Sequence, residues 1–372
     1  MNQPQQQQQD ASLQDIQINN PQHLPQDTVS DIQFNPQNPQ MFACSTWDGK
    51  IHIYQIAVQQ NFNQIVGQFQ QVSQMQYNEP ITCIAWRGDG QAIYAGCGDN
   101  SVVLFNLSNG QSAKIGQHQA GIRSIFYVQQ LNGAVITCSF DTTVCFWSEQ
   151  NPNNPLAKIQ LKGKIFAADC LFPILALGLQ GEVITFINLQ SNFQNLSPHQ
   201  INYIDSPLGK GSQINSIKIM CKGNGFGLGS IDGRANLGKL TPQNQNNVAG
   251  YKIDNIMTFK CHKNEEKQNN VVNQILYPVN SICFNPRQDQ FLLTCGSDGN
   301  MYFWDFEHKN KIKSFAFNKQ PISACNVSST GQFLAYSLGY DWHMGYEHSN
   351  SFEKPKICVH IINDDELRFR KN

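Results

Sequence analysis

Few residues of this chain could carry out chemistry. His118 precedes a segment that contains Ser139 and Asp141, and histidine, serine and aspartate are the residue types of a nucleophilic catalytic triad. The same segment ends in Trp147, which has no role in such a triad. Because buried polar side chains need hydrogen-bond partners, we expect His118, Ser139, Asp141 and Trp147 to form a buried network with a structural role.

Other signatures of catalysis and of ligand binding are weak or missing. The run Gly209-Lys210-Gly211-Ser212 lacks the glycine spacing with which a loop surrounds phosphates. The sequence contains no Cys-x-x-Cys, no His-Glu-x-x-His and no Gly-x-Ser-x-Gly motif. Cys261 and His262 are adjacent and would point to opposite sides of a strand, so together they make a poor metal site. We therefore expect no enzyme activity, no metal and no cofactor.

A repeated segment indicates which elements position these residues. Small residues lead into an Asp or Gln at a turn, and alternating apolar residues follow, as in Cys44-Ser45-Thr46-Trp47-Asp48-Gly49 before Ile51-His52-Ile53-Tyr54. Asp suits such turns because it bonds nearby backbone, and the alternation predicts a strand with one buried face. The turn positions are Asp48, Asp99, Asp141, Gln180, Asp232, Asp298 and Asp341.

These turns recur at intervals of roughly 40 to 65 residues, near the length of a four-stranded WD40 blade. The sequence therefore predicts an all-β fold, a seven-bladed WD40 β-propeller formed by residues 14–372 as a single domain. We expect the ring to be closed by an N-terminal strand, Asp15-Ile16-Gln17-Ile18-Asn19, that pairs with blade seven. Residues 1–13 are rich in Gln and are predicted to be a disordered tail.

Two polar segments are interpreted as loops. The Gln- and Asn-rich region from Ala57 to Gln76 is expected to lengthen the junction of blades one and two. The charged run from Lys263 to Asn270 is expected to be a surface loop before blade six.

Composition excludes several classes of protein. A net charge of -1 and a pI near 6.7 argue against a chain that binds nucleic acid through its overall charge, so any RNA contact must be local. No apolar stretch is long enough to span a membrane and the start is polar, which predicts neither membrane insertion nor a secretory signal. Twelve Cys, mostly in strand-like segments, indicate reduced thiols in a cytosolic or nuclear protein.

Unusual strings in the second half of the chain go beyond the repeat. They include Gly225-Phe226-Gly227-Leu228-Gly229-Ser230-Ile231-Asp232-Gly233-Arg234, Thr258-Phe259-Lys260-Cys261-His262, Tyr277-Pro278-Val279-Asn280-Ser281 and Tyr340-Asp341-Trp342-His343-Met344-Gly345-Tyr346-Glu347. Together they resemble the nuclear-pore mRNA export factor family of WD40 propellers, which bind the GLEBS segment of an FG-repeat nucleoporin. The paralogous mitotic checkpoint propellers share the first three strings but usually lack the Asp341-Trp342 step.

The resemblance implies a non-enzymatic adaptor that supports mRNA export. Its implied partners are a GLEBS-containing FG nucleoporin and single-stranded RNA or mRNP, and its implied location is the nucleus, the nuclear pore complex and the nuclear envelope, with a cytoplasmic pool. Three alternatives remain open: a mitotic checkpoint adaptor that binds checkpoint-kinase or spindle proteins, a propeller subunit of a ubiquitin ligase or chromatin complex, and a propeller enzyme.

The resemblance also implies a side groove that binds RNA or partner proteins. The matching positions are Arg234, Phe259, Lys260, Trp304, Asp305, Lys309 and Lys311. Such residues can contact phosphate and stack on bases. Phe306 stands where the family usually has Lys, and Lys309 where Arg is common, so we expect weaker or altered RNA binding. Several of these positions also have a structural interpretation: Trp304 as framework, Phe259 as cover of a blade interface, and the lysines as a solvated strand face.

Overall fold

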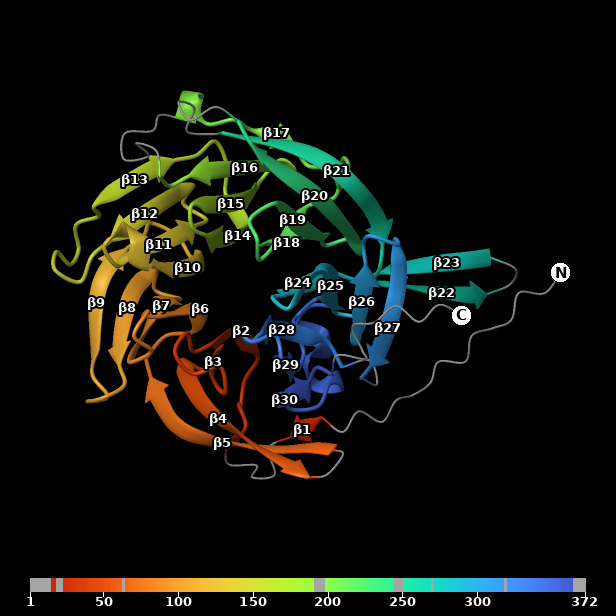
Figure 1. Ribbon diagram of the computed structural model, residues 1–372, viewed down its shortest axis with the longest axis horizontal. Helices are drawn as coiled ribbons and strands as arrows, with labels where there is room; N and C mark the ends of the chain where they lie inside the picture. Colours follow the sequence, from red (N-terminus) through yellow and green to blue (C-terminus); the bar gives the residue numbers. More distant parts are fainter. Residues whose placement is uncertain are drawn as a thin grey trace.

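A computed structural model describes residues 15–17, 23–61, 64–190, 198–243, 250–268, 271–317 and 320–363. Within these residues the chain forms seven four-stranded antiparallel sheets arranged in a ring around a central axis (Figure 1). The expected seven-bladed β-propeller is therefore confirmed. No helix in the described part of the chain is long and apolar enough to cross a membrane.

Blades one to three follow the chain in order from the innermost strand outward. Blade one contains β2 (Val29–Phe34), β3 (Met41–Thr46), β4 (Lys50–Asn61) and β5 (Gln64–Gln76). Blade two contains β6 (Ile81–Trp86), β7 (Ala92–Cys97), β8 (Ser101–Asn106) and β9 (Ser112–Gln117). Blade three contains β10 (Ile122–Val128), β11 (Ala134–Ser139), β12 (Thr143–Trp147) and β13 (Ala157–Gln160), with the 3-10 helix η2 (Gln129–Leu131) after β10.

Blades four to six repeat this order. Blade four contains β14 (Ile165–Leu171), β15 (Ile174–Leu179), β16 (Val183–Asn188) and β17 (Ile204–Asp205), with η4 (Pro198–Gln200) before β17. Blade five contains β18 (Ile214–Ile219), β19 (Gly225–Ser230), β20 (Arg234–Pro242) and β21 (Tyr251–Lys260). Blade six contains β24 (Val279–Asn285), β25 (Gln288–Gly296), β26 (Asn300–Asp305) and β27 (Asn310–Ala316).

Blade seven combines strands from both ends of the described chain. Its inner strands are β28 (Ile322–Val327), β29 (Phe333–Leu338) and β30 (Lys356–Ile361), with η5 (Tyr346–Ser351) between β29 and β30. Its outer strand is β1 (Ile16–Gln17), where Ile16 pairs with Val359 and Gln17 with Cys358. Asp15 also lies 2.7 Å from His360 Nδ1. Residues 18 and 19 of the expected closing strand, and the predicted tail of residues 1–13, lie outside the described residues.

Apolar packing joins each blade to its neighbours. The described residues contain seven buried clusters, and each cluster draws side chains from two adjacent blades. Ile136 of blade three, for example, packs with Leu175 of blade four. Burial of these side chains stabilises the ring as one cooperative unit, because no blade buries its faces without a neighbour.

Polar bonds reinforce the inner ring. The innermost strand of every blade has an irregular register at its second residue: Ser30, Thr82, Arg123, Phe166, Asn215, Asn280 and Ser323. Six of these side chains donate to a main-chain carbonyl of the next blade, as Ser30 Oγ does to Ile81 at 2.6 Å. The Phe166 side chain has no hydrogen-bond donor. Arg123 instead reaches both blade four and blade five, because it donates to Phe166 O at 2.7 Å and to Asn215 O at 3.1 Å.

Both segments expected to be loops contain strands. The region from Ala57 to Gln76 belongs to the long β4–β5 hairpin inside blade one, where Phe69 and Met75 are buried, so the expected junction loop was wrong. The charged run that begins at Lys263 forms β22 (Lys263–Gln268), which pairs with β23 (Val271–Leu276). This hairpin projects away from the ring (Figure 1). Polar composition had suggested loops, but backbone pairing does not require apolar side chains at an exposed edge.

Candidate functional site

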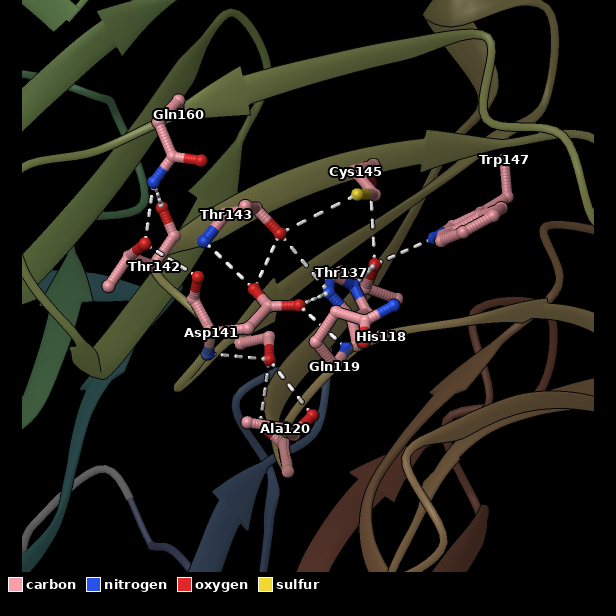
Figure 2. Close-up of polar contacts among 12 residues, drawn as sticks. His118, Gln119, Ala120, Thr137, Asp141, Thr142, Thr143, Cys145, Trp147 and Gln160 are labelled. Carbon is pink, nitrogen blue, oxygen red and sulfur yellow. Dashed lines mark hydrogen bonds and ion pairs between the residues drawn. The ribbon is translucent and has the colours of Figure 1, made fainter.

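The first expected site is a buried hydrogen-bond network in blade three (Figure 2). His118 Nδ1 lies 2.8 Å from Asp141 Oδ2, and His118 Nε2 lies 2.7 Å from Thr137 Oγ1. Trp147 Nε1 donates to the same Thr137 hydroxyl at 2.7 Å. Thr143 donates to the other carboxylate oxygen of Asp141 at 2.6 Å. One chain of bonds thus joins β11, β12 and the turn between them to the connection that precedes the blade.

Ser139 has a different place from the one that the sequence suggested. Its Oγ donates to the carbonyls of Ala120 and Gly121, each at 3.0 Å, and accepts the main-chain N–H of Asp141 at 3.1 Å. The hydroxyl that links His118 to Trp147 belongs to Thr137. Thr137 is fully buried, so no substrate can reach this triad-like geometry, and the arrangement stabilises the fold.

Burial of Asp141 opposes its ionisation, but the bonds from His118, Thr143 and the N–H of Gln119 outweigh that cost. They hold the pKa of Asp141 well below its usual range. The carboxylate is therefore charged at neutral pH and orients the imidazole ring.

A second network of the same design lies in blade six and was not anticipated. His262 Nδ1 lies 2.8 Å from Asp298 Oδ1, and His262 Nε2 lies 3.1 Å from Thr294 Oγ1. Trp304 Nε1 donates to Thr294 Oγ1 at 3.0 Å. His262 thus has a structural role beside Cys261, whose thiol lies near Gly233 O. Among the described residues, no group of three His, Cys, Asp or Glu could hold a metal ion.

The predicted groove residues fall on the boundary of blades five and six. Phe259 at the end of β21 and Trp304 of β26 have ring centroids 4.5 Å apart, and both side chains are half-buried. Lys311 is exposed, with its ammonium 5.0 Å from the centre of the Tyr302 ring. Lys260 follows Phe259 in the sequence, at the end of β21, and is exposed. We call Phe259, Lys260, Trp304 and Lys311 the basic-aromatic surface.

Three other predicted residues contribute less to this surface. Arg234 pairs across the strands with Lys260, but its Nη1 donates to Leu208 O at 3.0 Å and its Nε lies 3.0 Å from Asp232. Asp305 is buried and accepts bonds from the main chain of Glu307 and His308, so it holds the β26–β27 turn and does not face a ligand. Lys309 is exposed in that turn with a positive φ of 54°.

Sequence reasoning missed a set of exposed apolar side chains in connections of blades one and seven. Trp342, Met344 and Tyr346 lie in the connection between β29 and β30 of blade seven, with exposed fractions of 47, 45 and 80%. Trp47, in the equivalent connection of blade one, is 46% exposed. We call Trp47, Trp342, Met344 and Tyr346 the apolar face. A possible signal was the density of aromatic residues in a segment without strand alternation.

Polar bonds fix this face in place. Thr28 joins its two parts, because its carbonyl accepts the N–H of Trp47 at 3.0 Å and its hydroxyl donates to Tyr340 O at 2.9 Å. Asp341 accepts bonds from Asn280 and Ser297 of blade six. Trp342 has a φ of 63°, an uncommon conformation for a bulky residue that the surrounding bonds must maintain.

Comparison with known proteins agrees with this architecture. Residues 33–130 match the model of the anaphase-promoting complex subunit 4 WD40 domain, and residues 255–305 match the WD domain, G-beta repeat. The chain is 36% identical over 351 residues to "mRNA export factor rae-1" of Caenorhabditis elegans, covering 92% of this chain and 87% of the relative. It is 30% identical to "Poly(A)+ RNA export protein" of Schizosaccharomyces pombe, covering 96% and 93%. It is 31% identical to "Protein Rae1" of Drosophila melanogaster, covering 94% of each chain.

Proposed function

The chain belongs to the mRNA export factor family of WD40 propellers, and we propose that it is a non-enzymatic adaptor that binds a GLEBS-type nucleoporin segment at the nuclear pore. The apolar face is the observation that carries this proposal. Four large apolar side chains held out to solvent cost free energy in the unbound protein, and such patches typically mark sites of protein association. Burial of Trp342 and Tyr346 would provide aromatic anchors for the bound segment.

We assign a second contact, to RNA or mRNP, to the basic-aromatic surface. Lys260 and Lys311 offer ammonium groups to phosphate, while the exposed parts of Phe259 and Trp304 offer apolar contact to a base. The charge is local, since the whole chain carries a net charge of -1. We therefore propose weak RNA binding that increases the affinity of the adaptor for a messenger ribonucleoprotein. The adaptor would act in the nucleus and at the nuclear envelope, with a cytoplasmic pool.

The nucleoporin contact is tested with the double variant Trp342→Ala, Tyr346→Ala. We expect the dissociation constant for a recombinant GLEBS-type nucleoporin segment to rise by about tenfold or more, as the loss of aromatic anchors usually produces. Isothermal calorimetry with the purified full chain measures it. Leu156→Ala is the matched control, because Leu156 is 53% exposed in the β12–β13 connection, at the opposite end of the strands.

Unchanged affinity in the double variant would rule out the apolar face as the docking site. Failure of the parent protein to bind the segment would overturn the adaptor proposal itself. A parent that instead binds a GLEBS-like segment of a checkpoint kinase would assign the chain to the mitotic alternative.

The RNA contact is tested by charge reversal. Lys260→Glu with Lys311→Glu should weaken binding of a fluorescent single-stranded RNA by about tenfold and should reduce the salt dependence of binding. Lys252→Glu is the control, because Lys252 lies at the other end of β21 and its side chain is 59% exposed. Equal loss in the control would mean that only net charge matters, and the surface assignment would then be wrong.

A further inference from the structure

The β22–β23 hairpin leaves the ring between blades five and six and has no third strand. Lys263 pairs with Leu276 and Glu265 with Gln274, and the two strands form a sheet of their own that projects outward (Figure 1). An isolated two-stranded hairpin is marginally stable in water, and a third strand would add both backbone bonds and apolar burial.

The two edges of this hairpin differ in charge. The sequence of β22 carries four charged residues, Lys263, Glu265, Glu266 and Lys267, whereas β23 carries none from Val271 to Leu276. Charged side chains on an edge strand oppose the addition of another strand. The edge of β22 is therefore protected, and the edge of β23 is open.

Exposed apolar side chains accompany the open edge. Val272 is 50% exposed and Leu276 is 38% exposed. They are four residues apart on one strand, so both lie on the same face of the hairpin, with Gln274 between them. A strand added beside β23 could cover both side chains with apolar residues at alternate positions.

The open edge of β23 also ends next to the proposed docking face. Leu276 is followed by Tyr277, whose ring lies 6.0 Å from that of His343, in the same connection as Trp342 and Met344. On the other side, β22 begins at Lys263, three residues after Lys260 of the basic-aromatic surface. A polypeptide bound on the apolar face can therefore continue onto β23 without crossing a charged edge.

We infer that the free edge of β23 receives an extended, uncharged stretch of the docked polypeptide as a third strand of the hairpin. Main-chain N–H and C=O groups provide the bonds, and alternate apolar side chains of the partner pack on Val272 and Leu276. The inference rests on the proposed function, because the occupant is the segment that the apolar face binds.

The probe is the same recombinant GLEBS-type nucleoporin segment, and the readout is hydrogen exchange of the full chain with and without it. We expect exchange of amides in residues 272–276 to slow by at least about tenfold in the complex, because new backbone bonds protect them. Val272→Lys adds a charge to the open edge and should weaken affinity by about tenfold. Asn264→Lys adds the same charge to the edge of β22 and should leave affinity unchanged.

The outcomes separate the two proposals. If the segment binds but residues 272–276 gain no protection, and Val272→Lys binds as well as the parent, the strand addition is wrong while the adaptor function stands. If the segment does not bind the parent, both are overturned. Because Val272 is exposed, its variant should keep the parent's melting temperature, and equal weakening by Asn264→Lys would also contradict an edge-specific contact.

Discussion

A threonine hydroxyl is the central group in each of the two buried histidine networks. Thr137 accepts the indole N–H of Trp147 and can donate its own proton to His118 Nε2, while Thr294 stands in the same relation to Trp304 and His262. A hydroxyl suits this position because it accepts and donates at the same time. The network leaves both ring nitrogens of each histidine with a partner.

Thr137→Val tests the value of that hydroxyl. The substitution keeps the shape but leaves His118 Nε2 and Trp147 Nε1 buried without partners, so we expect unfolding to become easier by about 2 to 4 kcal/mol. Urea denaturation measures the change. Thr241→Val, at an exposed position near the end of β20, should have an effect within about 0.5 kcal/mol. Equal stability of the two variants would mean that the Thr137 bonds contribute nothing.

At this scale the sequence predicted His118, Asp141 and Trp147 together but missed their counterparts in blade six. The signal was available, since Thr137 and Trp147 are ten residues apart and so are Thr294 and Trp304. The histidine was hidden because it lies 36 residues before Asp298, against 23 in blade three. The inserted β22–β23 hairpin accounts for the longer separation.

For Arg234, the sequence predicted a function but did not show the contacts that the side chain makes within the fold. Its type and position predict a surface cation that Arg234→Glu could reverse without loss of stability. In the structure its guanidinium is bonded to Leu208 O and paired with Asp232, so a glutamate there would lose both contacts and face a like charge. Leu208 is 26 residues away in the sequence, so this contact leaves no local pattern, although Asp232 is only two residues away.

In the strands and hairpins, alternation of apolar and polar residues predicts structure better than the content of polar residues does. The segment around Gln68, Phe69 and Gln70 has the period of a strand, with Phe69 buried and both glutamines exposed, yet its glutamine content suggested a loop. The contact of Phe259 with Trp304 joins the outermost strand of blade five to the third strand of blade six, and the spacing of the repeat contains no information about it. The repeat predicts blades, but contacts between blades depend on how the ring closes.

At the scale of strands, we predict the contribution of Arg123 to the free energy of unfolding. Because Phe166 lacks a donor, this arginine supplies the polar link from blade three to both blade four and blade five. Arg123→Met should lower the free energy of unfolding by about 2 to 3 kcal/mol, since it removes bonds to two carbonyls. Ser323→Ala removes only neutral bonds, one to Val29 O and one with the Ser337 hydroxyl, and should cost about 1 kcal/mol. If urea denaturation shows the smaller loss for Arg123→Met, the two-interface link is refuted.

The whole ring depends on elements that are far apart in sequence. β1 pairs with β30, and seven apolar clusters bridge neighbouring blades, so local damage weakens the entire propeller. The proposed docking face and the basic-aromatic surface lie on connections and outer strands of this ring. Rigid positioning by the ring allows exposed side chains such as Trp342 to stay ordered in the unbound protein.

Buried carboxylates make the stability of this ring depend on pH. Asp141, Asp298 and Asp341 belong to blades three, six and seven, and for each one burial opposes ionisation while histidine and hydroxyl or amide bonds outweigh it, so its folded-state pKa lies below the usual value. A carboxyl with a depressed pKa binds protons more readily in the unfolded chain. Its stabilising contribution is therefore complete above the unfolded pKa near 4 and is lost as the pH falls through the folded pKa.

Asp298→Asn isolates one of these carboxylates. At pH 7 the variant should be less stable than the parent by about 3 kcal/mol, because it breaks a buried pair with His262. Below pH 4 the parent's carboxylate is lost progressively as well, so the difference between the two proteins should narrow. Urea denaturation at pH 7, 5, 4 and 3 measures this difference. A constant difference across the series would show that the charge of Asp298 does not stabilise the ring, and that its bonds act only through their geometry.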